Sequence, residues 1–434
     1  MIETLFNTSL WGDEAFSAIA CQKPFLSMMQ VVFKDTSPPL MYLIMWLWFR
    51  IFGSSEIAIR SLSLLFYLGT TLVVYLIGKK LFDVKTGIIA SLLTFFNPFL
   101  FPYAFEGRMY FCLLFFVVLS FYFLVSEKKT GYILSAAAAL YCHHFAILAV
   151  FSQFIYQAIK VKKLNSKSIR GVVKPYLFIA LLYLPWIYPL YRQTKLVAGG
   201  FWLGKPELKD LIGIFYHFLT HEIVIKAQNF IIILAAALLA LRKWRKKEIA
   251  DDLFLLSWAI LPVLLAFLIS QTKLSIFYER YLLYSVPPIM LLLSSKTRKI
   301  SIPLLGFILL IFITVSWHYF SHPFKRPFRE FAGWVKNNVS ADTFIANYNG
   351  GSHHLWETKY YGIEAPIYLP EGKLPFFVGT AQMGPEDTIR KFPQERPIGL
   401  ISSEDPDNIK ITDYWITGYH KVGSLYFVSL IKEQ

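Results

Sequence analysis

Long apolar runs, separated by short basic clusters, occupy the chain from Arg60 to about residue 320. Most of the runs approach the length of a membrane-spanning helix, for which about 20 residues are needed. The pattern predicts an all-α polytopic membrane bundle of about ten transmembrane helices. The expected spans lie near residues 60–78, 86–103, 109–125, 175–191, 228–241, 253–270, 281–294 and 301–318.

One further run, residues 131–159, is interrupted by Cys142-His143-His144. Basic residues flank it on both sides, so both of its ends are expected in the cytoplasm. An even number of crossings follows, and we predict two short helices with the His pair at their outer turn. Helices this short must pack against neighbours or reach a water-filled cavity.

The basic clusters also fix the sidedness of the other loops, because Lys and Arg are concentrated in cytoplasmic loops. Every second connection is then external, and the candidate polar residues fall together on the outer face. The cytoplasmic clusters are Lys79/Lys80, Lys128/Lys129, Lys160–Lys174, Arg242–Lys247 and Lys296–Lys299. The outer residues are Asp13, Glu14, Glu106, Arg108, His143, His144, Lys273, Glu279 and Arg280.

Composition supports the membrane assignment and excludes a nucleic-acid partner. Hydrophobic residues make up 56% of the chain and aromatic residues 18%, and the mean hydropathy is +0.48. The formal net charge is +15, but residues from Ser321 onward carry 12 basic against 13 acidic side chains. The positive excess therefore lies among the apolar spans, as expected of loops that face anionic lipid.

Residues 321–434 contain charges of both signs, frequent Gly and Pro, and short apolar stretches. We predict a small soluble α/β domain with a helix at Phe328–Val339, and its short apolar stretches include Thr343–Ala346, Ile398–Ser402 and Leu425–Ile431. The expected organisation is an outer loop with an amphipathic interfacial helix (1–59), a transmembrane bundle (60–320) and an outer soluble domain (321–434). The three cysteines are expected to be isolated thiols.

Asp13-Glu14 precede an amphipathic, aromatic-rich stretch that runs to about Phe52 and suits a helix lying in the membrane interface. A carboxylate fixed at the membrane surface could accept a proton from a hydroxyl or hold a divalent cation. The alternative is a helix N-terminus that is capped by acidic residues.

Three further segments combine ionisable and aromatic side chains at the expected outer boundary. Glu106-Gly107-Arg108 separates two apolar spans, so it is either part of a functional site or an ordinary charged loop. His143 could bind a metal with distant carboxylates, or form interfacial hydrogen bonds. Arg280-Tyr281 could bind a lipid phosphate through the guanidinium, or anchor a helix at the interface.

Taken in order along the chain, these motifs resemble the GT-C glycosyltransferases, specifically bacterial and archaeal relatives of protein O-mannosyltransferases and aminoarabinose transferases. The resemblance covers roughly residues 9 to 295. Its most specific parts are the acidic motif, Trp11–Ala15, and the Glu-x-Arg-x-Tyr turn, Glu106–Tyr110. The matching pieces are Trp11–Ala15, Asp35 with Pro38-Pro39-Leu40, Phe52-Gly53 to Arg60, Tyr103–Tyr110, Leu140–His143, Leu184–Trp186, Phe201-Trp202 and Arg280–Leu282.

The resemblance implies inverting transfer of a sugar from a polyprenyl-phosphate-linked donor to an acceptor hydroxyl on the outer face. It implies Asp13 as catalytic base, with Glu14 and Glu106 as further acidic residues of the site. The expected substrate-binding residues are Arg108, Arg280, Tyr281, Asp35 and Lys273. A divalent metal is an open possibility, with Asp13, Glu106 and His143 as candidate ligands.

Two other function classes are alternatives to a transferase. A transporter or flippase of lipid-linked saccharides would use the outer charges as a binding site, and a membrane scaffold would use the C-terminal domain to recruit partners. The acceptor, whether lipid, glycan or protein, is undetermined. Members of the family usually carry a transmembrane helix before the acidic motif, so we expect the natural gene to encode a further apolar helix upstream.

Overall fold

The computed structural model describes residue 6 and residues 8–161, 165–198, 203–220, 249–272, 275–295, 301–322, 325–350 and 353–433. The chain forms two compact units. The first unit comprises Met1–Asp35, Met45–Ile59 and Pro323–Gln434, and the second comprises Thr36–Ile44 and Arg60–His322. The N-terminal segment with the acidic motif thus folds in the same unit as the C-terminal domain.

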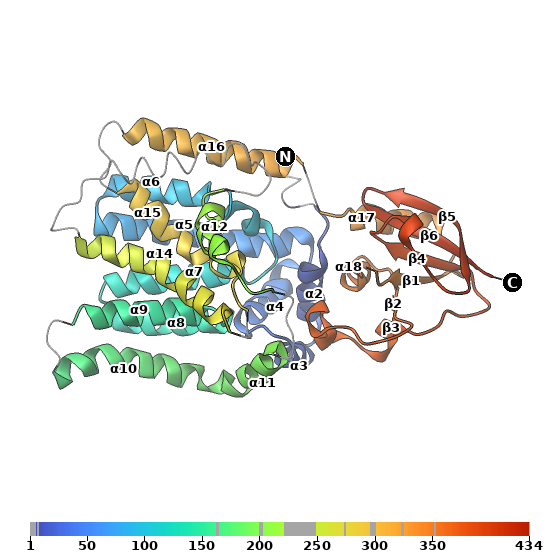
Figure 1. Ribbon diagram of the computed structural model, residues 1–434, viewed down its shortest axis with the longest axis horizontal. Helices are drawn as coiled ribbons and strands as arrows, with labels where there is room; N and C mark the ends of the chain where they lie inside the picture. Colours follow the sequence, from blue (N-terminus) through green and yellow to red (C-terminus); the bar gives the residue numbers. More distant parts are fainter. Residues whose placement is uncertain are drawn as a thin grey trace. The chain divides into compact units, whose positions relative to one another are not determined.

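The second unit is a helical bundle (Figure 1). Helix α8 packs between α7 and α10, α9 packs against α14, and α10 lies at the lower edge of the bundle in this view. Its helices are α5 (Glu56–Leu81), α6 (Val84–Phe95), α7 (Tyr110–Val125), α8 (Lys129–Cys142), α9 (Ala146–Ile159), α10 (Ser166–Tyr183), α11 (Ile187–Ala198), α12 (Leu208–His217), α14 (Ile249–Ser270), α15 (Val286–Ser294) and α16 (Ser301–Ser321).

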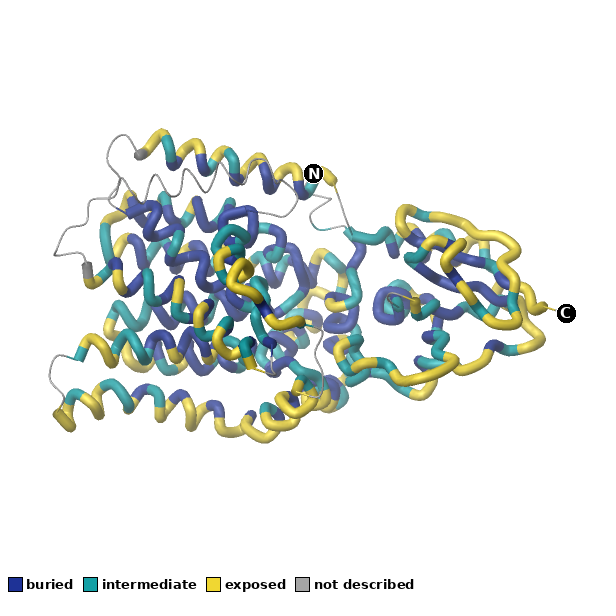
Figure 2. Tube along the Cα trace, in the orientation of Figure 1, coloured by how far each residue is buried: buried dark blue, intermediate teal, exposed yellow. Residues whose placement is uncertain are grey.

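Among the described residues, four helical stretches are long and apolar enough to cross a membrane: Glu56–Leu81, Ser166–Ala198, Ala250–Ser270 and Ile302–Ser321. Large apolar side chains on them are exposed, including Leu72 of α5, Leu181 of α10 and Leu310 of α16. Figure 2 shows this exposure along the length of α10 and α16. Exposed apolar helix faces suit lipid rather than water, so the chain is a multi-pass membrane protein.

The expected helix pair at residues 131–159 is confirmed. Cys142 ends α8, and α9 begins at Ala146 after a turn that contains both histidines. The span expected at 86–103 is shorter, because α6 ends at Phe95. Asn97 explains this end, since it precedes a proline and its side-chain oxygen accepts from the N–H groups of Phe99 and Leu100.

Two glycines allow α5 and α6 to cross at close range. A Cβ atom on Gly78 would lie 2.7 Å from the Cα atom of Gly87, and one on Gly87 would lie 2.6 Å from the carbonyl oxygen of Tyr75. Small residues that bring helix backbones together are typical of membrane bundles.

The C-terminal part of the first unit is a mixed α/β domain, as expected. Its six-stranded sheet has the order β3-β2-β1-β4-β6-β5, parallel from β3 to β4 and antiparallel from β4 to β5. The strands are β1 (Phe344–Tyr348), β2 (Ile367–Tyr368), β3 (Thr388–Ile389), β4 (Ile398–Ser402), β5 (Tyr414–Val422) and β6 (Leu425–Lys432).

Both faces of this sheet are covered by apolar side chains. Helix α17 (Phe328–Asn338) packs Phe331 and Val335 against Phe427 on one face, while Leu400 and Val428 belong to the core on the other. The remaining helices with residues in this unit are α2 (Gly12–Gln22), α3 (Phe25–Lys34), α4 (Leu40–Phe52) and α18 (Leu355–Tyr360).

Several predictions fall outside the described residues, namely the span at 228–241, the Arg242–Lys247 and Lys296–Lys299 clusters, Phe201-Trp202 and Lys273. The total of about ten transmembrane helices stays a prediction. The cysteines differ in part from expectation, because the sulfur atoms of Cys112 and Cys142 lie 2.8 Å apart between α7 and α8. The helix hairpin brings the two thiols together.

Candidate active site

The acidic motif forms the first turn of α2. Trp11 has an extended backbone at the N-cap position, and Asp13 and Glu14 follow in the first turn, where the helix dipole favours negative charge. The two carboxylates differ in environment, since Asp13 is exposed whereas Glu14 is fully buried. Successive helix positions point in different directions, so only Asp13 can present its side chain outward.

Glu14 is held by a buried ion pair. Its Oε2 atom accepts a hydrogen bond from the ammonium of Lys325 at 2.8 Å, and both side chains are almost completely buried. The same carboxylate oxygen lies 3.4 Å from the backbone nitrogen of Trp11, and the Lys325 ammonium lies 5.2 Å from the Trp11 ring. The start of α2 is therefore fixed by a cation that follows the last apolar helix in sequence.

A second polar network fixes the residues that precede α2. The Tyr361 hydroxyl accepts from the backbone N–H of Leu10 at 2.8 Å and donates to Glu56 at 2.9 Å. Burial raises the pKa of Tyr361 well above its ordinary value, so the hydroxyl stays protonated and can donate. Arg329 also donates to Glu56 at 2.6 Å, and its backbone N–H donates to the Ser9 hydroxyl.

In the second unit, the Glu106-Gly107-Arg108 turn follows a short 3₁₀ helix, Phe101–Phe105. Glu106 is buried, and its carbonyl oxygen accepts a hydrogen bond from the Ser63 hydroxyl. Glu106 and Arg280 both interact electrostatically with Tyr103. The structure thus brings together two of the ionisable residues expected to form the site.

Arg280 lies among tyrosines. Its guanidinium donates to the Tyr278 hydroxyl at 2.6 Å and contacts the Tyr110 hydroxyl at 3.4 Å. Among the residues that the structure describes, the buried Nε–H of Arg280 has no hydrogen-bond partner. A buried donor of this kind requires an explanation, and an anionic ligand supplies one because guanidinium binds phosphate in a forked geometry.

The two histidines have separate roles. The His143 ring lies 5.0 Å from the rings of both Phe145 and Tyr281, so it belongs to an aromatic stack. His144 is hydrogen-bonded to the Tyr183 hydroxyl at 3.1 Å and to the Gln193 amide oxygen at 2.7 Å. His144 therefore connects the α8–α9 turn to α10 and α11.

The predicted site residues are distributed over both units. Asp13, Glu14 and Asp35 belong to the first unit, and Asp35 caps the end of α3. Glu106, Arg108, His143, Arg280 and Tyr281 belong to the second. Within the described ranges, no group of three or more His, Cys, Asp and Glu side chains could hold a metal ion.

Residues 36–191 match the family model of dolichyl-phosphate-mannose-protein mannosyltransferases. The chain is a glycosyltransferase, and its likeness to this family covers residues 36–191. The matched segment contains the Glu106–Arg108 turn and both histidines, whereas Asp13 and Arg280 lie outside it. No curated protein sequence matches the chain.

Two solved structures share the fold of this glycosyltransferase. The chain is similar to ArnT from Cupriavidus metallidurans bound to undecaprenyl phosphate, with a TM-score of 0.63, 10% sequence identity, and coverage of 98% of this chain and 95% of that chain. The apo state of the same ArnT gives a TM-score of 0.53 at 11% identity, with the same coverage. The likeness therefore extends over the helical bundle and the C-terminal domain.

Sequence reasoning missed the residues that support the candidate site. Lys325, Arg329 and Tyr361 lie outside the motifs, and Glu56, which lies within the piece from Phe52 to Arg60, was not singled out. Tyr103, Tyr110 and Tyr278 carried a signal, since they lie within the motifs of Glu106 and Arg280, but aromatic residues at a membrane boundary are common.

Proposed function

We propose that the protein is an inverting glycosyltransferase that moves a sugar from a polyprenyl-phosphate donor to an acceptor hydroxyl on the outer membrane face. The observation that carries the donor assignment is the Arg280 cluster, formed by Arg280 with Tyr103, Tyr110 and Tyr278. Arg280 is partly buried, and its buried Nε–H has no hydrogen-bond partner among the described residues. The family description names a lipid-phosphate sugar, and the similar ArnT structure is bound to undecaprenyl phosphate.

The proposed reaction is a single displacement. The acceptor oxygen attacks the anomeric carbon, the bond from that carbon to the phosphate oxygen breaks, and polyprenyl phosphate leaves. The acceptor proton passes to the carboxylate of Asp13. Attack opposite the leaving group inverts the anomeric configuration.

Two features support the division of roles. Asp13 is exposed at a helix start that Glu14 and Lys325 hold in place, so its carboxylate can meet an acceptor. Glu14 then acts by positioning Asp13 rather than by touching the substrate. Arg280 stabilises the negative charge that develops on the leaving phosphate, which is the largest electrostatic demand of the reaction.

Glu106, Arg108, Tyr281, Asp35 and Lys273 are proposed as further residues of the substrate site. The role of Glu106 is supported by Tyr103, with which both Glu106 and Arg280 interact electrostatically. Asp13, Glu106 and His143 are the candidate ligands if a divalent metal takes part. Metal dependence is checked by assaying transfer after chelation and after addition of Mg²⁺ or Mn²⁺.

The test of the base is Asp13→Asn, which keeps the shape of the side chain and removes its basicity. We expect transfer from a labelled polyprenyl-phosphate sugar, in nanodiscs with a membrane-extract acceptor, to fall by about 100-fold or more. Asp407→Asn, at an exposed position of the C-terminal domain, is the matched control and retains activity. Near-normal turnover by Asp13→Asn protein with an unchanged melting temperature contradicts the assignment.

A further inference from the structure

The sheet of the C-terminal domain carries a groove of about 800 Å³ on the face that α17 partly covers. We call it the sheet groove, and it is lined by the end of α17, the loop before β4 and the β5–β6 hairpin. All of these elements belong to the first unit. Its volume falls within the range of about 300–1,000 Å³ that is typical of small-molecule sites.

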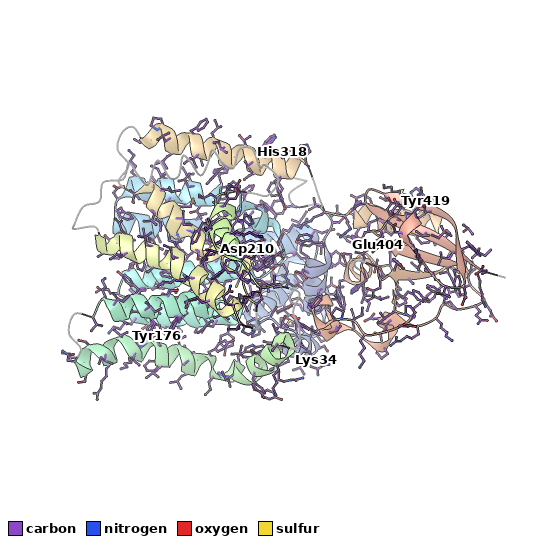
Figure 3. The ribbon with its side chains drawn as sticks, viewed as in Figure 1. Lys34, Tyr176, Asp210, His318, Glu404 and Tyr419 are labelled. Atoms are coloured by element: carbon purple, nitrogen blue, oxygen red, sulfur yellow. The ribbon has the colours of Figure 1, made fainter. Side chains whose placement is uncertain are left out.

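The groove exists because α17 ends at Asn338, whereas the sheet continues beyond it through β5 and β6. Strand β5, on which Tyr419 lies (Figure 3), is exposed along most of its length (Figure 2). Gly418 faces Ser429 across the hairpin, and a Cβ atom on Gly418 would meet nothing within 4 Å. The lack of a side chain at this position leaves the groove open.

An aromatic pair forms one wall of the sheet groove. The rings of Trp334 and His420 are stacked, with centroids 3.9 Å apart and an angle of 6° between their planes. Trp334 also lies 5.6 Å from Phe427, which is part of the core, so the pair has a rigid support. His420 itself is exposed, and the pair therefore offers an aromatic surface to a ligand.

Polar groups line the rest of the groove. Arg396 is anchored by hydrogen bonds from Nε to the carbonyl oxygen of Asp342 and from Nη2 to that of Ala341, at 2.8 and 3.3 Å. Asn338 and Glu395 add an amide and a carboxylate to the lining. Planar groups that donate or accept two hydrogen bonds at once are suited to pairs of neighbouring hydroxyls.

We propose that the sheet groove is a carbohydrate-binding site. A sugar ring has one face rich in C–H groups and a rim of hydroxyls, so it can stack on the Trp334–His420 pair while its hydroxyls bond to Arg396 and Asn338. The lining contains one carboxylate, Glu395, and two cations, Arg396 and Lys432, and the carboxylate opposes a polyanion, which favours a neutral, hydroxyl-rich ligand.

A competing occupant is an extended peptide or a second copy that pairs with the edge strand β5. The ladder between β5 and β6 is irregular between Ile416 and Gly418. A bulge of this kind twists a strand and opposes the addition of another strand at its edge. The saccharide is therefore the favoured occupant, and the proposal does not depend on the transfer reaction.

The experiment uses the full chain in detergent. A glycan array carrying neutral and acidic oligosaccharides identifies a binding glycan, and calorimetry measures its affinity without donor. Gly418→Leu places a side chain in the groove, and we expect its affinity to fall about tenfold or more. The control is Gly333→Leu on α17, where an added Cβ atom also meets nothing within 4 Å, and its affinity stays within about twofold of the wild type.

Each contrary outcome overturns the proposal. Absence of glycan binding by the wild type excludes a saccharide site. Equal affinity of the wild type and Gly418→Leu places the bound glycan elsewhere. A dimer that Gly418→Leu dissociates, detected by light scattering, assigns the groove to self-association. Because binding is measured without donor, these results are separate from the test of Asp13.

Discussion

Side chains of the same chemical type differ in burial in this protein, and burial separates their roles. Asp13 and Glu14 are adjacent carboxylates, yet one is exposed and the other takes part in a buried ion pair. Arg280 is hydrogen-bonded to the hydroxyls of Tyr110 and Tyr278, and a neutral hydroxyl does not cancel the positive charge of a guanidinium. Such a charge is costly to bury unless an anion binds to it.

Arg280→Lys tests the phosphate role. Lysine keeps the charge but loses the planar fork, so we expect the KM for the polyprenyl-phosphate donor to rise about tenfold, with a smaller change in kcat. Arg192→Lys, an exposed position on α11, is the control. Initial rates at varied donor concentration separate the two constants, and an unchanged KM would argue against donor contact.

Lys325→Met tests the anchoring of α2. Removal of the ammonium leaves the buried Glu14 carboxylate without this partner, and we expect a loss of about 3–5 kcal/mol of stability in the first unit. Glu14→Gln combined with Lys325→Met removes both charges and recovers part of that loss. Thermal unfolding of the purified chain provides the measurement.

The chain offers a matched control for the anchor. Lys209 and Glu207 form an ion pair at 2.9 Å, but both side chains are largely exposed. Lys209→Met is therefore expected to leave the melting temperature close to that of the wild type, because an exposed ion pair contributes little to stability. If Lys325→Met were as mild as Lys209→Met, the buried pair would not hold α2 in place.

At the scale of elements, packing compensates for helices that are too short to cross a membrane alone. Helices α8 and α9 have 14 residues each, about 21 Å of helix against a hydrocarbon thickness of about 30 Å. They pack against α7, α10 and α14, and the ends that meet at the histidine turn, Cys142 and Ala146, are buried among protein.

The crossing of α5 and α6 gives a test at this scale. Gly87→Val places a Cβ atom within 3.0 Å of the Tyr75 carbonyl oxygen and the Lys79 nitrogen, so the helices must separate. We expect a loss of about 1–3 kcal/mol, observed as a lower melting temperature. The control is Gly306→Val on α16, where a Cβ atom meets nothing within 4 Å, and it should keep the wild-type melting temperature. Equal melting temperatures of Gly87→Val and Gly306→Val would show that the glycine crossing is unimportant.

At the scale of the molecule, the asymmetry of charge implies a direction in the membrane. The basic α7–α8 turn is expected in the cytoplasm, and the near-neutral C-terminal domain is expected outside. This orientation decides which face carries the acidic motif, because the motif folds in one unit with that domain.

Cysteine labelling tests the orientation. The three native thiols are buried, so an impermeant maleimide should report introduced cysteines. We expect Asn338→Cys to react in intact cells and Lys128→Cys to react only after the membrane is opened; both positions are exposed. Reaction of both from one side would overturn the proposed outer placement.

The sequence by itself determined several of the elements and the assignment as a glycosyltransferase. Apolar runs and the histidine break predicted α7, α8 and α9, because the length and periodicity of a helix are local properties. The same holds for α17 and the strands β4 and β6. The ordered motifs predicted the glycosyltransferase family because each combines rare residue types at a short spacing.

Only the tertiary structure decided which partners those elements meet. It joined the acidic motif to the C-terminal domain, buried Glu14 against Lys325, and left Asp13 exposed. It also gathered Tyr103 and Tyr278 around Arg280 and opened the sheet groove beside Gly418. These contacts join residues that are distant in the chain, and burial depends on everything packed around a side chain, which no local pattern specifies.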